Sequence, residues 1–197
     1  MRFVRRFFKS RMGGQQTDFW ESLRRPAQPL HFVRRKFLLH GQSYNVILHK
    51  EAATNRLVVQ GSSFVVSLSP CTHENFERFM EAWYRRQARQ TFQSAIDHWI
   101  REFHARGIHL PAPRMKIYAM RRAWGRCYYT KGLITMNLHL VKTPLPCIRY
   151  IVLHELCHFL VNNHSKDFHA LVESFLPDWR EVDMRLKSFT REQRVLE

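Results

Sequence analysis

Apolar residues recur along this chain at two different spacings, and each spacing predicts a different kind of element. Between residues 37 and 67, short runs of β-branched and aromatic residues are separated by turn-forming glycine and asparagine. This pattern predicts a small antiparallel meander. From about Thr72 to Arg106 the apolar residues recur at steps of three and four. We therefore expect one long amphipathic helix there, ended by Gly107.

The second half of the chain predicts three more strands followed by three helices. The strand-like segments span residues 116–119, 127–130 and 133–137. The first helix starts near Pro144 or Pro146 and runs to a break at Asn162–Asn163. The second begins with Ser165 as its cap, and the third with the capping pattern Asp178-x-x-Glu181. The predicted fold class is α+β, with a small, mostly antiparallel sheet packed with a long helix and the C-terminal helices.

Composition supports one folded domain. Of the 197 residues, 45% are hydrophobic and 13% aromatic, which is enough to bury a substantial core. We predict a basic, loosely ordered extension at residues 1–29 and a single domain at residues 30–197. The four cysteines form no C-x-x-C pair, so a reducing, cytoplasmic setting is expected. No apolar run is long enough to cross a bilayer, and no transmembrane segment is expected.

The charge of the chain is strongly positive. Lysine and arginine number 32 against 16 acidic residues, which gives a formal net charge of +16. Such a charge attracts anions, so nucleic acid or a nucleotide is a candidate partner. The sequence gives no indication of the oligomeric state.

The segment His154-Glu155-Leu156-Cys157-His158 lies inside the first C-terminal helix and carries the candidate chemistry. Residues four apart on a helix point the same way, so His154 and His158 can bind one ion. Glu155 lies about 100° around the helix from His154 and can reach a water in the open position of that ion. This pattern predicts a zinc site in which Glu155 activates the bound water.

A catalytic zinc site usually has three protein ligands, so one more is needed. His164 follows the predicted helix break, and a chain reversal there would bring it back over the first pair. The competing candidates are His169, Glu173 and Cys157. Cys157 points away from His158 on the helix and is better explained as a small buried thiol.

The motif and its surroundings resemble the YgjP-like family of zinc metallopeptidases, which is related to the SprT-like and WLM families. The matching segments are Trp124-Gly125-x-Cys127, Ile134–Asn137, Tyr150–His158, Asn163-His164-Ser165-x-x-Phe168 and Pro177–Trp179. The resemblance implies a zincin-like α+β fold and a catalytic glutamate at Glu155. It also implies zinc ligands at His154, His158 and His164, and so favours His164 over its competitors.

Three functions are compatible with these features. The leading hypothesis is a zinc metallopeptidase that acts on a peptide or protein substrate through a water activated by Glu155. A second is a nucleotide phosphoanhydride hydrolase that uses the same site, for which only the basic charge argues. A third is a nucleic-acid-associated protease of the SprT-like kind, or a nucleic-acid-binding protein with structural zinc.

Residues that contact the substrate are harder to predict. Arg122, Trp124 and Asn137 are candidate substrate-binding residues. Arg122 and Asn137 are also candidates to stabilise the oxyanion, together with Tyr128 and Tyr129. That role requires a donor within about 3 Å of the reacting oxygen, a distance that depends on tertiary structure.

Overall fold

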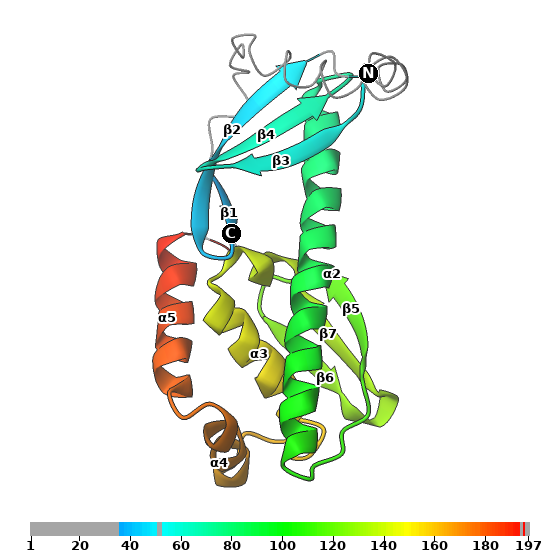
Figure 1. Ribbon diagram of the computed structural model, residues 1–197. Helices are drawn as coiled ribbons and strands as arrows, with labels where there is room; N and C mark the ends of the chain where they lie inside the picture. Colours follow the sequence, from blue (N-terminus) through cyan, green and yellow to red (C-terminus); the bar gives the residue numbers. More distant parts are fainter. Residues whose placement is uncertain (1–35, 51–52, 194, 196–197) are drawn as a thin grey trace, which may run out of the picture. The chain divides into compact units, whose positions relative to one another are not determined.

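The computed structural model describes residues 36–50, 53–193 and 195. The predicted extension at residues 1–29 lies outside these residues. The contacts within the chain divide it into two compact units. The first includes residues 44–79, and the second includes residues 38–43 and everything from residue 80 onward. Both units combine helix with sheet, in agreement with the predicted α+β class (Figure 1).

The first sheet contains four strands in the order β1-β2-β4-β3. Their bounds are β1 Phe37–Leu39, β2 Gln42–Lys50, β3 Arg56–Gln60 and β4 Ser63–Leu68. β4 pairs parallel with β2 and antiparallel with β3, so the prediction of an antiparallel meander is wrong. The reason is burial: β4 is buried over almost its whole length, whereas Val58 and Val59 of β3 are 39% and 45% exposed. An apolar strand covered on both faces lies inside a sheet, and the half-exposed strand takes the edge.

Aromatic side chains form the core of the first unit. Phe64 of β4 is completely buried and stacks on Tyr44, with ring centroids 4.4 Å apart. Phe37 packs edge-on against Phe76, with centroids 5.8 Å apart. These rings tie the start of the following helix to its own sheet.

The long helix predicted from the apolar spacing is present as α2, His73–Ala105. Its apolar stripe is buried, including Phe92, Ile96 and Phe103. The helix is followed by Gly107, which has φ of +75°. Glycine adopts this left-handed conformation without steric strain, so it is suited to the turn that ends the helix.

The second sheet has three strands in the order β5-β7-β6, and it supports the candidate site. The strands are β5 Arg114–Tyr118, β6 Gly125–Tyr128 and β7 Leu133–Asn137, with the 3-10 turn η1, Tyr129–Lys131, between β6 and β7. β7 pairs parallel with β5 and antiparallel with β6. This sheet is therefore also mixed rather than mostly antiparallel. β6 lies at its edge.

The H-E-x-x-H segment ends the next helix, α3, Leu145–Cys157, which follows the 3-10 segment η2, Leu138–Lys142. The helix was predicted to continue to Asn162–Asn163. Instead His158 is its C-cap, and the N–H of Phe159 donates to the carbonyl oxygen of Leu156 at 3.0 Å. Such i to i+3 bonds tighten the last turn and end the helix early.

Two further helices close the chain, as predicted: α4, Lys166–Phe175, and α5, Trp179–Glu192. The hydroxyl of Ser165 accepts a hydrogen bond from the N–H of Phe168, which confirms Ser165 as the cap of α4. Asp178 stands at the predicted N-cap of α5, but its side chain forms no capping hydrogen bond. The predicted capping interaction at Asp178 is therefore wrong, although the helix boundary is right.

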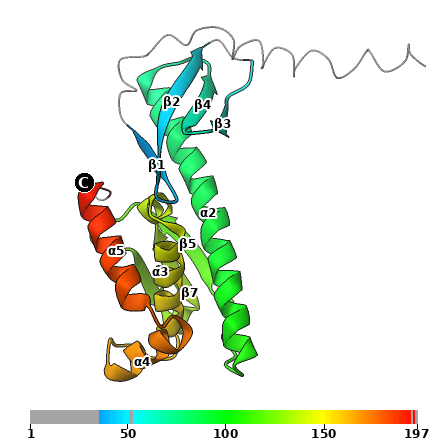
Figure 2. The ribbon, with the colours of Figure 1, turned by 60° about the vertical axis from the view of Figure 1, so that its left-hand side comes forward.

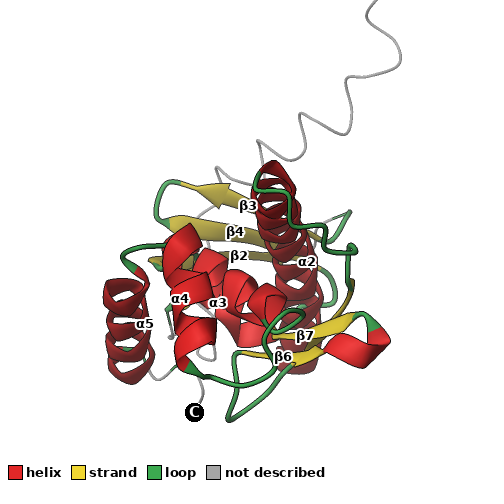
Figure 3. Cartoon of the chain, turned by 90° about the horizontal axis from the view of Figure 1, so that it is seen from below, coloured by secondary structure: helices red, strands yellow, loops and turns green. Residues whose placement is uncertain are grey.

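Packing within the second unit fixes α3 from several sides. Figures 1 and 3 show α3 between α5 on one side and the strands β6 and β7 on the other. The indole N–H of Trp99 in α2 donates to the carbonyl oxygen of Arg149 in α3 at 2.8 Å. Figure 2 shows α3 and α5 side by side from a second direction. Among the described residues, every helix is too short or too polar to span a membrane.

Candidate metal centre

Three imidazoles converge where α3 ends and α4 begins. The ring nitrogens of His154, His158 and His164 that could bind one ion lie within 4.8 Å of one another. The Nε2 atom of His154 is 3.2 Å from that of His158 and 2.9 Å from that of His164. The structure thus brings together all three histidines that the sequence nominated.

The local backbone explains why they meet. His154 lies in the last turn of α3, and His158 is the C-cap residue with φ −66° and ψ −12°. The N–H of Val161 still donates to the carbonyl of Cys157 at 3.0 Å, after which the chain leaves the helix. The Asn163 side chain then accepts the N–H of Ser165 at 3.3 Å. This turn carries His164 back towards the pair on the helix.

The hydrogen bond of His158 fixes which of its nitrogens can bind a metal. Its Nδ1 lies 3.0 Å from the carbonyl oxygen of Val161. Because a carbonyl oxygen can only accept, Nδ1 carries the proton and Nε2 is left with its lone pair directed at His154. Ligand histidines in proteins are oriented by the same kind of second hydrogen bond.

One aromatic ring contacts all three imidazoles. Phe168, which is 1% exposed, stacks on His158 with centroids 4.5 Å apart. Its centroid lies 4.8 Å from that of His154 and 4.9 Å from that of His164. The ring therefore forms an apolar floor beneath the cluster, and it restricts how the imidazoles can turn.

The electrostatic environment favours neutral imidazole at the centre of the cluster. Burial lowers the pKa of His154 to about 3, helped by repulsion from His158, His164 and His169. Burial also lowers the pKa of His158. A metal binds the neutral form of histidine, so protons compete weakly for this site near neutral pH.

Glu155 lies on the inner side of the helix. Glu155 is only 5% exposed, and burial raises the pKa of its carboxyl group to about 8. The backbone of Gly125 in β6 packs directly against it, since a Cβ on Gly125 would lie 2.5 Å from Oε1 of Glu155. Burial and the negative charge of Glu155 raise the pKa of the Cys127 thiol to about 12. Strand β6 therefore covers the carboxyl group that the motif supplies.

The competing third ligands lie elsewhere. His169 stacks on the indole of Trp179, with centroids 5.1 Å apart and the rings inclined by 5°. Glu173 pairs with Arg180 at 2.7 Å. Cys157 is completely buried, as expected for a small core thiol.

The predicted substrate residues are only partly accessible. Asn137 is completely buried, and its Oδ1 accepts the N–H groups of Met120 and His139 while its Nδ2 donates to the carbonyls of Met120 and Ala123. All of its hydrogen-bonding groups are used, so the prediction that Asn137 contacts substrate or an oxyanion is wrong. It instead holds the loop before β6.

The other candidates lie on or near that loop. Arg122 is exposed and Trp124 is half-buried immediately before β6. Tyr128 is the last residue of β6 and Tyr129 the first of η1, and their side chains are 39% and 49% exposed. Their contact with substrate remains a prediction.

Two residues that shape the site were not assigned a role from the sequence. Gly125 and Phe168 both occur in the segments that resemble the family, and their identities were the available signal. A glycine inside a strand often marks the close approach of another group. The nature of that group, a carboxyl, depends on how β6 packs against α3.

Comparison with known proteins decides the family. A sequence profile of the YgjP-like metallopeptidase domain matches residues 5–189. The chain belongs to the YgjP-like metallopeptidase family. The match confirms the resemblance seen in the motifs. Membership of this family identifies the YgjP-like protein as a metallopeptidase in general.

Two solved structures are similar to part of this YgjP-like chain. The metallopeptidase zymogen abylysin of Pyrococcus abyssi is 22% identical, with 49% of this chain and 92% of abylysin covered and a TM-score of 0.44. The metallopeptidase zymogen jannalysin of Methanocaldococcus jannaschii is 17% identical, with 49% and 94% covered and a TM-score of 0.42. No curated protein matches the sequence. The family assignment therefore rests on the sequence profile.

Proposed function

We propose that this YgjP-like protein is a zinc-dependent peptidase in which His154, His158 and His164 hold the ion and Glu155 is the general base. The convergence of the three imidazoles within 4.8 Å carries the proposal. Zinc binds imidazole nitrogen at about 2.0–2.1 Å in tetrahedral geometry, which separates ligand nitrogens by about 3.3 Å. The separations of 2.9 and 3.2 Å from His154 are close to that spacing.

The exposure of the cluster supports a catalytic rather than a structural role. His154 and His158 are half-buried, whereas His164 is exposed. Three protein ligands with one side open to solvent are typical of catalytic zinc sites, whereas structural sites have four. A bound zinc ion would contribute the acidification of water and the polarisation of a substrate carbonyl.

Glu155 has the properties of a general base for this reaction. It takes a proton from the attacking water and delivers it to the leaving nitrogen as the C–N bond breaks. Its pKa of about 8 lies near the pH range in which a base exchanges protons most readily. The packing of Gly125 against its carboxyl group limits the positions that the group can adopt.

The position of β6 supports a peptide as the substrate. β6 pairs with β7 along one edge, and in the part of the chain that the structure describes no strand pairs with its other edge. Extended peptides commonly bind by adding a strand to such an edge. A peptide bound along β6 would lie on the strand that also contacts Glu155 through Gly125.

The metal assignment is tested by zinc analysis of purified wild type and three single variants. We expect about one zinc per chain in wild type and in Glu155→Gln, as is normal for a single catalytic site. We expect loss of zinc in His154→Ala. His169→Ala is the matched control, because this imidazole stacks on Trp179 rather than joining the cluster. Retention of zinc by His154→Ala would contradict the proposed ligand set.

Activity is tested on the same proteins with casein and with nucleoside triphosphates. We expect wild type to cleave casein and Glu155→Gln to lose this activity while keeping its zinc. Release of pyrophosphate by wild type without peptide cleavage would contradict a peptidase and favour the nucleotide hydrolase. Equal casein cleavage by wild type and Glu155→Gln would remove Glu155 from the mechanism.

A further inference from the structure

A cavity of about 360 Å³ lies between the C-terminal half of α2 and the first two turns of α3. Its lining includes two guanidinium groups, two imidazoles and two hydroxyl groups. They belong to Arg101, Arg149, His40, His98, Thr91 and Ser94. No carboxylate belongs to the lining in the part of the chain that the structure describes. The cavity therefore presents positive charge and hydrogen-bonding groups to a ligand.

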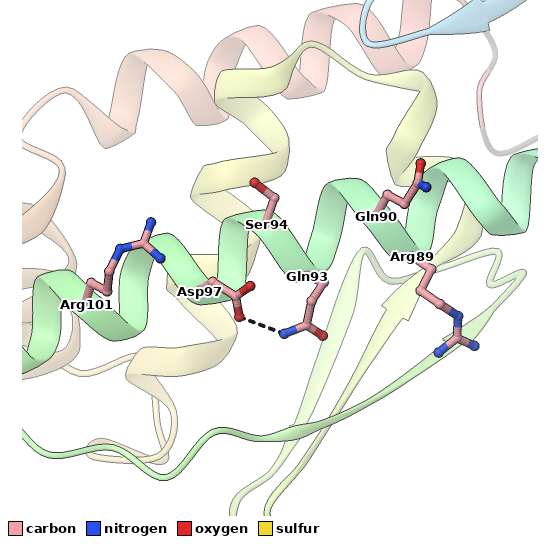
Figure 4. A pocket seen from close by; sticks show the side chains of 6 residues that line it. All are labelled: Arg89, Gln90, Gln93, Ser94, Asp97 and Arg101. Atoms are coloured by element: carbon pink, nitrogen blue, oxygen red, sulfur yellow. Dashed lines mark hydrogen bonds between the residues drawn. The ribbon is translucent and has the colours of Figure 1, made fainter.

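The two arginines have no acidic partner among the described residues. Asp97 lies one helical turn before Arg101, but its carboxylate accepts a hydrogen bond from Gln93 at 2.8 Å. Figure 4 shows the hydrogen bond that joins this pair, with Arg101 on the next turn of α2. The same face of α2 forms a second depression of about 470 Å³ that includes Arg89 and Asp97, and Ser94 and Arg101 line both hollows. An anion in the first cavity would therefore be the partner of Arg101 and Arg149.

The backbone conformation of His40 places its imidazole at the cavity. His40 has φ of +50°, which is unfavourable for a residue with a side chain. Its N–H donates to the carbonyl of Val141 at 3.0 Å, and the N–H of Gly41 donates to that of Lys142 at 2.9 Å. Its Nε2 lies 3.0 Å from the hydroxyl of Thr91. Three contacts thus hold a strained turn so that this ring faces Thr91.

The first turn of α3 adds to the positive potential. Pro144 is the N-cap residue, and no side chain caps this end of the helix. Helix N-termini carry partial positive charge and free N–H groups, which favour an anion nearby. Arg149 lies in the next turn of α3, and its carbonyl oxygen accepts a hydrogen bond from the Trp99 indole at 2.8 Å. This hydrogen bond joins α2 and α3, the two helices that line the cavity.

We propose that this cavity binds a compact phosphate-bearing anion. Guanidinium groups bind phosphate oxygens through paired hydrogen bonds, and imidazole and hydroxyl groups complete such sites. Cavities that bind small molecules usually measure about 300–1,000 Å³, so the volume here suits a small ligand. The ligand is either free inorganic phosphate or a small phosphomonoester. This site is distinct from the candidate metal centre and does not depend on the proposed peptidase activity.

The test measures binding of inorganic phosphate and of methyl phosphate to the zinc-loaded full chain by calorimetry at constant ionic strength. Arg101→Gln and Arg149→Gln remove one guanidinium each from the cavity, and both residues are exposed enough to be replaced without disturbing the core. Arg89→Gln is the matched control, because Arg89 lies on the same helix and lines only the second depression, whereas Arg101 lines both and Arg149 only the first cavity. Thermal unfolding confirms that each variant is folded.

We expect saturable binding to wild type, weakened about tenfold or more by each cavity substitution, as for lost charge-assisted hydrogen bonds. Arg89→Gln should bind as wild type does. Binding of methyl phosphate as well as phosphate would identify a phosphomonoester site, and binding of phosphate alone a free-phosphate site. Two results overturn the proposal: no saturable binding to wild type, or binding that Arg101→Gln and Arg149→Gln leave unchanged. The second would place the anion at the metal or at scattered surface charges.

Discussion

The Cα atom of Gly125 packs against the carboxyl group of Glu155. A Cβ atom at position 125 would lie 2.5 Å from Oε1, 2.6 Å from Cγ and 2.7 Å from Cδ of Glu155. Such distances do not occur between real side chains, so any larger residue must displace the carboxyl group. Gly125 belongs to β6 and Glu155 to α3. The strand therefore determines where the proposed base can lie.

Gly125→Ala should reduce peptidase activity while leaving the metal bound. The added methyl group displaces the Glu155 carboxyl, and a misplacement of about 1 Å can reduce the rate about 100-fold. The three atoms nearest to the added group all belong to Glu155 rather than to the three histidines, so zinc content should remain at the wild-type level. The measurement is kcat on a peptide substrate together with zinc analysis. Wild-type kcat in this variant would contradict a positioning role for Gly125.

A double-mutant cycle separates this effect from general damage to β6. In wild type, Gly125→Ala should lower the free energy of unfolding by about 1–3 kcal/mol, as overpacking does. In the Glu155→Ala background the Cγ, Cδ and Oε1 atoms are gone, so the same substitution should cost much less. Additive effects of the two substitutions would show that the alanine acts on something other than Glu155.

Phe168 should affect zinc affinity as well as stability. Its ring contacts His154, His158 and His164 at centroid distances of 4.5–4.9 Å. Phe168→Ala should lower the free energy of unfolding by about 3–5 kcal/mol, and groups that support metal ligands typically alter affinity by about 10–100-fold. If Phe168→Ala does not fold, the measurement uses Phe168→Leu, which keeps most of the side-chain volume and should fold. Zinc affinity is measured by competition with a chelator.

Phe175 provides the matched control for this prediction. It is also buried in α4, but its ring packs against Phe103 at 4.2 Å and Trp99 at 6.4 Å. Phe175→Leu should therefore destabilise the fold to a similar degree and leave zinc affinity unchanged. If both leucine variants weaken zinc binding equally, Phe168 acts only through global stability.

The ligands on the helix could be predicted from the sequence because helical periodicity is local. His154 and His158 are four residues apart, so one turn of α3 brings them together whatever surrounds them. His164 was harder to predict, because its position depends on a turn that begins before the expected break at Asn162–Asn163. The resemblance to the family favoured His164, and spacing alone left its competitors open.

Contacts between elements distant in sequence could not be predicted in the same way. Gly125 and Glu155 are thirty positions apart, and only the packing of β6 against α3 brings them together. The parallel pairing of β2 with β4 was also missed, because apolar alternation indicates a strand but not its neighbour. The polar side chain of Asn137 makes it a candidate for substrate binding, but no local pattern indicates that this side chain is buried and fully bonded.

Asn137 should behave as a structural residue when replaced. Asn137→Asp keeps the acceptor for Met120 and His139 but loses the N–H donors to the carbonyls of Met120 and Ala123. Leaving buried groups without partners costs about 1–3 kcal/mol, and the loop at residues 119–124 should exchange its amide hydrogens faster. The measurements are chemical denaturation and hydrogen exchange. Unchanged stability and exchange, with a raised KM alone, would instead indicate contact with substrate.

His139 should make the fold sensitive to acid. Burial lowers the pKa of His139 to about 4, with repulsion from Lys142 adding to this shift and attraction from Glu81 opposing it. Its ordinary value is 6.5, so as pH falls from 6.5 towards 4 the unfolded chain takes up a proton that the folded chain refuses. Stability is therefore lost over this range and is fully present above it.

Because the histidines of the metal centre also titrate, the informative quantity is the difference in unfolding free energy between wild type and His139→Asn. Urea denaturation of metal-free protein at several pH values between 4 and 7 should give a shallower loss of stability in the variant. Parallel curves for the two proteins would mean that His139 takes up its proton equally well in the folded and unfolded chain.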